Sequence, residues 1–367
     1  MSVKSLFQPF DVKSLHLENR IVMAPMTRGF SPGNVPNDLN VEYYRKRAAG
    51  GVGLIITEGT CVGHKAANGY PNVPFIYGDE ALAGWKRVVD AVHKEGGKIA
   101  PQLWHVGSTR RAGVEPDPEV PGYGPSGLVM PGKKRCHEMT EEDIADVIAA
   151  FAKAAADSER IGFDAVEIHG AHGYLIDQFF WEGLNERTDK WGGSLVARTR
   201  FAAEIIKAIR AEVSDDFPVI LRWSQWKQQD YTVKLAKNPA ELEQFLTPLS
   251  EAGVDVFHCS TRRFWEPEFE DSDLNLAGWT KKLTGKPTIT VGSVGIDTAF
   301  TEAGQAEFSE GKPADIDELI RRMEAGEFDL VAVGRALIAN PDWVKKVKAE
   351  AFADMAPYTK DLLTKLA

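Results

Sequence analysis

The chain has 367 residues, of which 43% are hydrophobic, and its 43 basic and 53 acidic side chains give a net charge of -10. This length can bury a large core, and the negative charge argues against nucleic acid as a partner because nucleic acid is itself an anion. No stretch approaches the roughly 20 apolar residues that span a bilayer, and the N-terminus lacks the apolar centre of a secretion signal, so we expect a cytoplasmic protein without membrane attachment.

Residues 1–20 alternate apolar with polar side chains, and Leu15 and Leu17 are set against His16 and Glu18. A period of two is typical of strands with one buried face. The segment precedes the first strongly apolar run, so we expect a hairpin that covers the floor of the fold.

Short apolar runs rich in β-branched residues recur along the rest of the chain and predict strands. Eight such runs begin near Ile21, Gly53, Lys98, Asp164, Pro218, Val254, Pro287 and Phe328. Segments with helical signals lie between them, at 79–95, 140–161, 198–213, 239–252 and 315–325. Alternating apolar strands and helices indicate a closed parallel sheet, so we expect an α/β fold, a (β/α)8 TIM barrel that forms a single domain over residues 1–367.

The limits of one helix can be read from its ends. Thr140 precedes Glu141, Glu142 and Asp143, which places a hydroxyl at the N-cap and acids in the first turn. Gly162 follows the last helical residues as a C-terminal stop.

Residues 106–139 interrupt the repeat after the third strand. This segment is rich in Pro and Gly and is too long for a simple connection. We expect it to form a capping insertion over the barrel mouth.

Three groups that hydrogen-bond or move protons follow the fourth predicted strand: His169, His172 and Tyr174. Ligands of β/α barrels bind at the carboxyl ends of the strands, so this position indicates chemistry rather than packing. The histidines could instead bind a metal or be structural hydrogen-bond partners. However, no third ligand stands at a suitable spacing, and we expect no bound metal.

Polar and planar side chains also mark the ends of other strands. Gln102 and Trp104 end the third strand, Arg222 ends the fifth, and Thr27 follows the first. Gly59, after the second, lets a ligand approach the backbone closely. An amide, an indole and a guanidinium facing one cavity suit a flat, electron-accepting ring, although Arg222 could simply form an ion pair at its strand end.

Glycines follow the last two predicted strands, in the pairs Gly292-Ser293 and Gly334-Arg335. Backbone amides and an arginine at these positions make a phosphate site that is frequent in β/α barrels. The expected ligand is therefore flat at one end and phosphorylated at the other.

Several motifs in this order resemble the Old Yellow Enzyme family of FMN-dependent ene-reductases. They cover nearly the whole chain: NRIVMAPMT at 19–27, HGAHGYL at 169–175, NERTDKWGGS at 185–194, and Gly334-Arg335. Because several motifs match in the correct order, the resemblance is far more specific than any single motif.

The resemblance implies a role for each motif residue. The ring of bound FMN would contact Ala24, Pro25, Met26, Thr27, Gly59, Gln102 and Arg222, and its phosphate would contact Gly292, Ser293, Gly334 and Arg335. His169 and His172 would bind the substrate oxygen, and Tyr174 would donate the proton. Tyr70 and Trp104 would line the substrate slot. A cation near the pyrimidine end of the ring would stabilise reduced flavin.

The resemblance also implies an activity. NAD(P)H would give a hydride to flavin and leave, and an electron-poor alkene would then take that hydride at its β carbon and a proton at its α carbon. The expected substrates are α,β-unsaturated aldehydes and ketones, maleimides and nitro compounds, and the enzyme would be a monomer or a homo-oligomer. Arg110 and Arg111 in the insertion would suit NADPH phosphates, although exposed arginines usually face only solvent.

The chain departs from the family pattern at several places. Many classical members have asparagine where this chain has His172, and the branch resembling thermophilic enzymes usually has cysteine where it has Thr27. Trp223, Trp226 and the segment 262–265 match no pattern that we can carry over. Tyr358 is a candidate for the family's C-terminal active-site tyrosine.

Two other functions fit part of the sequence. A flavin-free phosphate-binding barrel, a lyase or isomerase with a histidine base, would use the late glycines and Arg335 but leave Gln102, Arg222 and Thr27 unexplained. A non-catalytic flavoprotein would be yellow but inert towards enones.

Overall fold

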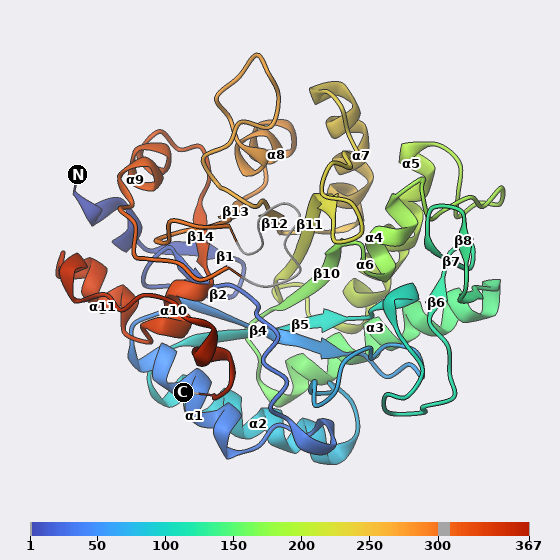
Figure 1. Cartoon of the computed structure of the whole chain (residues 1–367), viewed down its shortest axis with the longest axis horizontal. Coiled ribbons are helices and arrows are strands. Elements are labelled where there is room, and N and C mark those ends of the chain that lie inside the picture. Colours follow the sequence, from blue (N-terminus) through green and yellow to red (C-terminus); the bar gives the residue numbers. More distant parts are fainter. Residues whose placement is uncertain (1, 300–308, 367) are drawn as a thin grey trace.

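The computed structural model describes residues 2–299 and 309–366. Parallel strands close into a barrel in the order β10-β11-β12-β13-β14-β3-β4-β5 (Figure 1). Their bounds are β3 Ile21–Met23, β4 Leu54–Cys61, β5 Lys98–Trp104, β10 Val166–His172, β11 Val219–Lys227, β12 Val256–Ser260, β13 Thr288–Val291 and β14 Leu330–Val333. The predicted (β/α)8 barrel is confirmed, and every barrel strand begins within two residues of its predicted start.

Helices surround the barrel (Figure 1). The longer ones are α1 Asp38–Ala49, α2 Asp79–Lys94, α3 Glu141–Ile161, α6 Arg200–Glu212, α7 Pro239–Ala252, α8 Leu276–Thr284 and α9 Asp317–Glu324. Shorter ones are α4 Leu175–Phe180, α5 Leu195–Arg198, α10 Arg335–Ala339 and α11 Trp343–Lys348, with 3-10 turns at Val3–Phe7, Pro32–Asn34, Gly107–Thr109, Phe352–Asp354 and Lys360–Leu363. Within residues 2–299 and 309–366, no helix has the length and apolar character needed to cross a membrane.

The ends of α3 are those that the sequence predicts. The Thr140 hydroxyl accepts the Asp143 amide, the Asp143 carboxylate accepts the Thr140 amide, and Gly162 closes the helix with a φ of 100°. Helix α1 lacks such a simple pattern. It buries Tyr43, Tyr44 and other polar side chains rather than an aliphatic stripe, so hydrophobic periodicity does not reveal it.

The barrel floor is covered by the predicted hairpin. Strands β1 (Phe10–Val12) and β2 (Leu15–Leu17) pair antiparallel. Leu15 and Leu17 are buried in the same cluster as the inward side chains of the barrel, including Val22, Leu54 and Ile220. The hairpin therefore completes the core from below and leaves the opposite end of the barrel for ligands.

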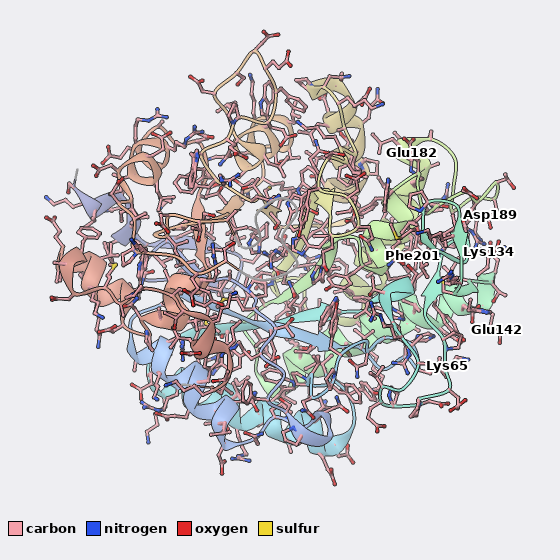
Figure 2. All side chains as sticks on the ribbon, in the orientation of Figure 1. Lys65, Lys134, Glu142, Glu182, Asp189 and Phe201 are labelled. Atoms are coloured by element: carbon pink, nitrogen blue, oxygen red, sulfur yellow. The ribbon has the colours of Figure 1, made fainter. Side chains whose placement is uncertain are left out.

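The insertion after β5 contains β6 (Tyr123–Gly124), β7 (Leu128–Met130), β8 (Lys133–Lys134) and β9 (His137–Glu138). Arg187, in the loop after α4, donates to the carbonyls of Pro125 at 2.7 Å and Met139 at 2.6 Å. Figure 2 shows Lys134 and Asp189 on the same side of the molecule. These hydrogen bonds connect the insertion to the loop after α4.

Arg110 holds the insertion together from inside. The residue is buried, and its guanidinium donates to the backbone carbonyls of Asn68, Val114, Glu115, Asp117 and Val120. Arg110 thus ties these backbone segments to one another, and of the two neighbouring arginines Arg111 is the exposed one.

Candidate active site

The end of β10 brings His169, His172 and Tyr174 together. The His169 ring centroid lies 5.1 Å from the centroids of both His172 and Tyr174. His172 and Gly173 have φ angles of 65° and 78°, in the left-handed region that non-glycine residues rarely adopt. This turn ends the alternation of the strand, so polar side chains close in sequence can converge.

Hydrogen bonds from neighbouring elements hold the turn. Asp177 accepts the Gly173 amide at 2.7 Å, and the Ser224 hydroxyl accepts the His172 amide at 3.0 Å. The side chain of Gln178 donates to the Gly173 carbonyl at 2.8 Å. A left-handed residue costs about 1–3 kcal/mol, and persists where the surrounding structure compensates for it, as these bonds do here.

A buried ion pair supports the same turn from below. Lys227 at the end of β11 meets Asp177 of α4 at 2.6 Å, and both side chains are fully buried. Burial raises the pKa of Asp177 to about 6, against the opposing effect of the Lys227 ammonium. The pair links β11 to α4 beside this turn, since Lys227 is in register with His172.

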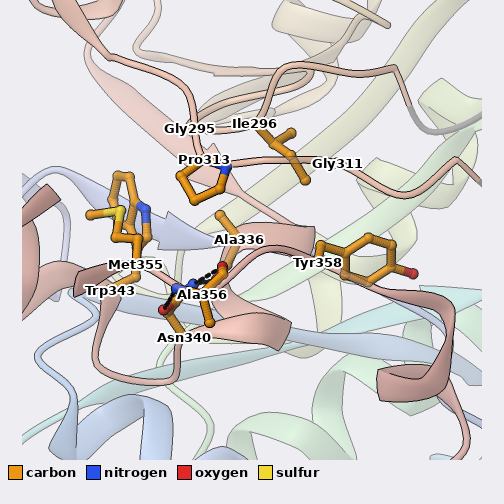
Figure 3. A pocket seen from close by; sticks show the side chains of 10 residues that line it. All are labelled: Gly295, Ile296, Gly311, Pro313, Ala336, Asn340, Trp343, Met355, Ala356 and Tyr358. Atoms are coloured by element: carbon orange, nitrogen blue, oxygen red, sulfur yellow. Dashed lines mark hydrogen bonds between the residues drawn. The ribbon is translucent and has the colours of Figure 1, made fainter. Parts of the chain in front are cut away.

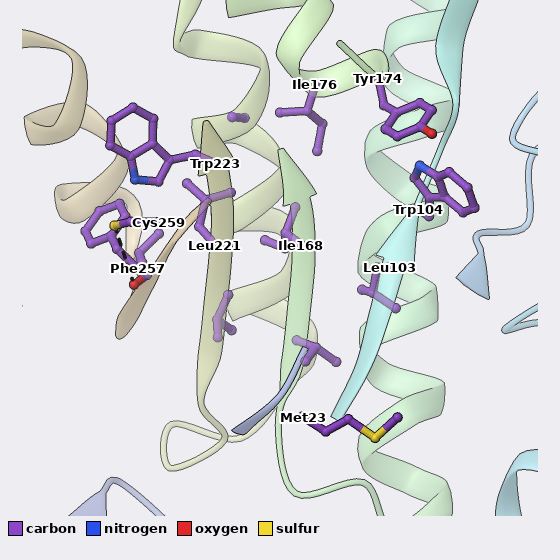
Figure 4. Close-up of a cluster of buried hydrophobic side chains, with 14 of the residues drawn as sticks. Met23, Leu103, Trp104, Ile168, Tyr174, Ile176, Leu221, Trp223, Phe257 and Cys259 are labelled. Atoms are coloured by element: carbon purple, nitrogen blue, oxygen red, sulfur yellow. Dashed lines mark hydrogen bonds between the residues drawn. The ribbon is translucent and has the colours of Figure 1, made fainter. Parts of the chain in front are cut away.

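Trp104 forms the wall of the slot. It stacks on Tyr70 and His169 at centroid distances of 5.4 Å and 5.8 Å, and it meets Tyr174 edge-on at 4.9 Å. Figure 4 shows Trp104 and Tyr174 side by side. A Cβ at Gly59 would lie 2.3 Å from Trp104 Cε3, so only glycine leaves room for this indole. The hydroxyls of Tyr70 and Tyr174 are 3.0 Å apart.

A polar layer lies inside the barrel at the level of the histidines. Gln102 Nε2 donates to Glu167 at 2.7 Å, and the other carboxylate oxygen of Glu167 is 2.6 Å from His258 Nδ1. Arg222 pairs in register with His169 on one side and His258 on the other. Among the described residues, Arg222 Nε and His258 Nε2 are buried without a hydrogen-bond partner.

The electrostatics of the site keep its proton donors neutral. Burial, and secondarily the Arg222 cation, lower the pKa values of His169 and His172 well below the usual range for histidine. Burial, and secondarily Tyr70, raise the pKa of Tyr174 well above the usual range for tyrosine. At neutral pH the site therefore presents uncharged imidazoles and a protonated phenol.

The segments after β13 and β14, where the sequence predicts a phosphate site, meet through Thr298 and Arg335. Gly292 and Ser293 have φ angles of 142° and 53°. Arg335 is buried and donates to Thr298 and to the carbonyl of Ser309, the latter at 3.0 Å. These two contacts flank residues 300–308, which lie outside the described part of the chain.

The end of β3 lies against the same loops. The Ala24 amide donates to the Val333 carbonyl at 2.9 Å, and a Cβ at Gly334 would lie 3.5 Å from Met26 Sδ. Thr27 is exposed just beyond. The predicted ring contacts of the first strand and the predicted phosphate contacts of the last strand are thus neighbours in space.

Glu58, a residue without a predicted role, fastens the segment after β3. One carboxylate oxygen accepts the amides of Arg28 and Gly29, both at 3.0 Å. Its other oxygen is buried and has no partner among the described residues. Burial raises the pKa of Glu58 to about 7.

Trp223, which matched no pattern in the sequence, and Tyr358, the candidate C-terminal active-site tyrosine, both lie apart from the histidines. Trp223 is fully buried, and Figure 4 shows it beside Cys259 and Phe257, away from Trp104. Tyr358 packs with Ile296 and Ile338, and its ring lies 5.6 Å from the Arg335 guanidinium. It lines a small cavity of about 10 Å³ together with Ile296 and Ala336 (Figure 3), so this tyrosine lies beside the residues after β13 and β14.

Further polar residues of the site are not apparent from sequence motifs. Glu167, His258, Ser260 and Trp226 lie on strands whose apolar neighbours dominate the pattern. The available signal is positional: Glu167, His258 and Ser260 share the inward parity of Ala165 and Val256. A polar residue at an inward position of a barrel strand therefore merits attention.

The cysteines lie outside this cluster. Cys61 and Cys259 are buried, Cys136 is partly buried, and all three are free thiols. Burial raises the pKa of each, to about 11 for Cys136 and about 12 for Cys259. Over the described ranges, no group of three His, Cys, Asp or Glu side chains is arranged to hold a metal ion.

The two sides of the barrel mouth differ in chemistry. Beside β10 and β11, neutral hydrogen-bond donors and a buried guanidinium lie at an aromatic slot, and a buried arginine lies near the glycines that follow β13 and β14. This division suits a cofactor that is flat at one end and phosphorylated at the other. Such a cofactor is typical of barrel oxidoreductases.

Comparisons with known proteins agree with this class. The sequence profile of the NADH:flavin oxidoreductase / NADH oxidase family matches residues 5–353. Putative 12-oxophytodienoate reductase 4 of Oryza sativa subsp. japonica is 34% identical over 364 residues, 97% of this chain and 87% of that protein. 12-oxophytodienoate reductase 2 of Arabidopsis thaliana is 34% identical over 358 residues, which cover 94% of this chain and 89% of that protein.

Solved structures lead to the same group. Morphinone reductase in complex with tetrahydroNAD superposes with a TM-score of 0.80 at 30% identity, covering 98% of this chain and 93% of that one. The chain therefore belongs to the NADH:flavin oxidoreductase / NADH oxidase family, the FMN oxidoreductases of the Old Yellow Enzyme type.

The residues at the mouth fit FMN. Arg222 is buried, and its Nε has no hydrogen-bond partner within the described chain. With the side-chain amide of Gln102, it could donate to a polar ring edge. A second buried arginine, Arg335, lies at the other side near Ser293, since both side chains donate to the carbonyl of Thr298. Guanidinium groups and glycine amides are suitable partners for an anionic phosphate.

Proposed function

We propose that this protein is an NAD(P)H-dependent ene-reductase that reduces carbon–carbon double bonds conjugated to a carbonyl, imide or nitro group. The convergence of His169, His172 and Tyr174 carries the proposal, because neutral donors and a protonated phenol meet beside one slot. The names of the relatives, 12-oxophytodienoate reductase and morphinone reductase, support a reductase. The tetrahydroNAD complex of the latter supports a nicotinamide hydride donor.

FMN would be held by the residues at the two sides of the mouth. Ala24, Pro25, Met26, Thr27, Gly59, Gln102 and Arg222 would contact its ring, and Gly292, Ser293, Gly334 and Arg335 its phosphate. When bound, it supplies a two-electron carrier that accepts hydride from NAD(P)H and passes it to the alkene.

The side chains of this protein would do the rest of the chemistry. His169 and His172 would donate hydrogen bonds to the substrate oxygen, where negative charge grows as hydride arrives at the β carbon. Tyr174 would protonate the α carbon, and its raised pKa keeps the proton available at neutral pH. Tyr70 and Trp104 would form the slot that holds the alkene flat.

The first test is the visible absorption spectrum of the purified protein, with the chromophore identified after denaturation. We expect a flavin band and released FMN. A colourless protein that also fails to take up added FMN would refute the ring site and favour the flavin-free lyase or isomerase. A yellow protein that does not reduce cyclohexenone, N-methylmaleimide or nitrostyrene would instead be the non-catalytic flavoprotein.

The second test separates the two half-reactions in stopped-flow measurements. Tyr174→Phe should slow alkene reduction by about 10²-fold or more, the usual contribution of a positioned acid, and leave flavin reduction by NAD(P)H nearly unchanged. Tyr70→Phe is the matched control, because it removes the hydroxyl 3.0 Å from that of Tyr174 and keeps the ring stacked on Trp104. Equal losses in both half-reactions of Tyr174→Phe would exclude the proton-donor role.

A further inference from the structure

His172 has a close partner on the second of its ring nitrogens. Its Nε2 lies 2.7 Å from the hydroxyl of Ser260, the last residue of β12. Ser260 is itself buried, with 3% of its surface exposed. The same hydroxyl oxygen is 3.4 Å from Arg222 Nη2, so it lies between an imidazole and a guanidinium.

The donor and acceptor properties of these groups determine which nitrogen of His172 carries the proton. A guanidinium can only donate, so the Ser260 oxygen accepts from Arg222. Of these two neighbours, only His172 Nε2 can accept the hydroxyl proton of Ser260. A neutral imidazole that accepts at Nε2 carries its own proton on Nδ1. The neutral form is favoured because burial and the cations around the ring, Arg222 first, lower the pKa of His172.

His169 has the complementary arrangement. Its Nδ1 accepts the backbone amide of Ala171 at 3.4 Å, which leaves the proton on Nε2. The two imidazole planes are nearly perpendicular, at 89°. The pair can therefore offer one N–H from each ring, from different nitrogen positions, to a single acceptor.

Trp226 holds His172 in this orientation. Its indole stacks on the imidazole at 4.5 Å with an angle of 22° between the planes, and its Nε1 donates to the Ser260 carbonyl at 3.1 Å. Ser260 thus anchors both His172 and the ring packed against it. The imidazole has little freedom to turn over and exchange its nitrogens.

We propose that Ser260 is a positioning residue that sets the tautomer of His172, so that Nδ1–H faces the substrate oxygen. The proposal rests on the ene-reductase function, since it supplies one of the two donors that this function requires. It also specifies the ligand chemistry: the site takes an oxygen that accepts two hydrogen bonds, such as a carbonyl, nitro or phenol oxygen.

The test is ¹⁵N NMR of holoenzyme labelled at its histidines, because protonated and unprotonated imidazole nitrogens have well-separated shifts. His172→Gln assigns the signals by their loss. In the parent protein we expect protonated Nδ1 and unprotonated Nε2 at His172. Ser260→Ala should shift this signal pattern towards protonated Nε2, and Ser260→Thr, which keeps a hydroxyl, should restore the parent pattern.

Ser108→Ala is the control. This serine is also buried, and its hydroxyl has no hydrogen-bond partner among the described residues, so its loss should leave the His172 signals unchanged. A protonated Nε2 at His172 in the parent protein, or a protonated Nδ1 that persists in Ser260→Ala, would overturn the proposal.

Ligand binding gives a second readout. Phenol titrated against the oxidised enzyme should bind about five- to tenfold more weakly to Ser260→Ala, the loss expected for one weakened hydrogen bond, and Ser260→Thr should recover the affinity. Unchanged phenol affinity in Ser260→Ala would also count against the proposed role of Ser260. The NMR result does not depend on turnover, so failure of enone reduction with the expected tautomers would refute the proposed function and leave the role of Ser260 intact.

Discussion

At the scale of single residues, Gly59 shows how a missing side chain shapes the mouth. The indole of Trp104 occupies the space where a Cβ would stand, 2.3 Å from Trp104 Cε3. Trp104 in turn contacts Tyr70, His169 and Tyr174. A single methyl group on Gly59 would therefore disturb the contacts of Trp104 with these three aromatic rings.

Gly59→Ala should destabilise the protein by about 1–3 kcal/mol, the usual cost of overpacking, and should weaken FMN retention because the displaced indole enters the ring site. Chemical denaturation and the FMN content after gel filtration measure the two effects. Adding Trp104→Phe should restore part of both, since a smaller ring leaves room for the methyl group. A double variant no better than Gly59→Ala would show that the clash lies elsewhere.

The residues closest together in sequence were the easiest to predict. His169, His172 and Tyr174 lie within one turn, and their convergence follows from that turn alone. Ser260 and Trp226 meet His172 only because β10, β11 and β12 are neighbours in the closed sheet. Contacts of this kind depend on strand register, which a single sequence does not specify to the atom.

At the scale of elements, the Asp177–Lys227 pair joins α4 to β11. Both side chains are fully buried, and Lys227 also donates to the Ser224 carbonyl at 3.2 Å. Removing one partner of a buried pair leaves the other charge uncompensated, whereas removing both relieves the cost. Loss of either partner alone should therefore destabilise the turn that carries His172 and Gly173.

Lys227→Met should lower the free energy of unfolding by about 3–5 kcal/mol near neutral pH, and Lys227→Met with Asp177→Asn by clearly less. Burial already raises the pKa of Asp177 to about 6, and loss of the lysine raises it further. The folded Asp177 then holds a proton that the unfolded chain releases, so stability falls as pH rises above about 4.

Urea denaturation at a series of pH values checks this expectation. Stability should keep falling to higher pH in Lys227→Met than in the parent protein, and the slope should flatten in the double variant. Identical slopes in the two would mean that Asp177 is not the titrating group.

Elements with a clear hydrophobic period were predicted well, and those that depend on tertiary packing were not. Strands of the closed barrel bury both faces, so their apolar runs stand out in the sequence. Helices α4, α5, α10 and α11 are each six residues long or shorter, less than two turns, and a period of 3.6 cannot be recognised over that length.

At the scale of the whole molecule, the floor hairpin and the candidate active site lie at opposite ends of the barrel. Leu15 and Leu17 of the floor hairpin pack beneath the inward side chains, while His169, His172 and Tyr174 lie at the carboxyl ends of the strands. Residues of the floor should therefore affect folding without affecting the reaction.

Leu17→Ala should lower stability by about 2–5 kcal/mol, the range for deleting a buried leucine side chain, and leave kcat and KM unchanged below the melting temperature. Thermal denaturation and steady-state kinetics on the same samples measure both. Leu39→Ala is the control, because that leucine is 54% exposed and should change neither. A raised KM in Leu17→Ala would show that floor and mouth are coupled.

The burial of the three cysteine thiols matters for an enzyme with this proposed activity. Maleimides and enones are alkylating agents, because the conjugated bond that accepts hydride also adds thiolates. Cys61 and Cys259 are buried, Cys136 is partly so, and the raised pKa of each keeps the thiol protonated at neutral pH. The protein would thus offer the proposed electrophilic substrates almost no nucleophilic sulfur, and we expect it to keep its activity in their presence.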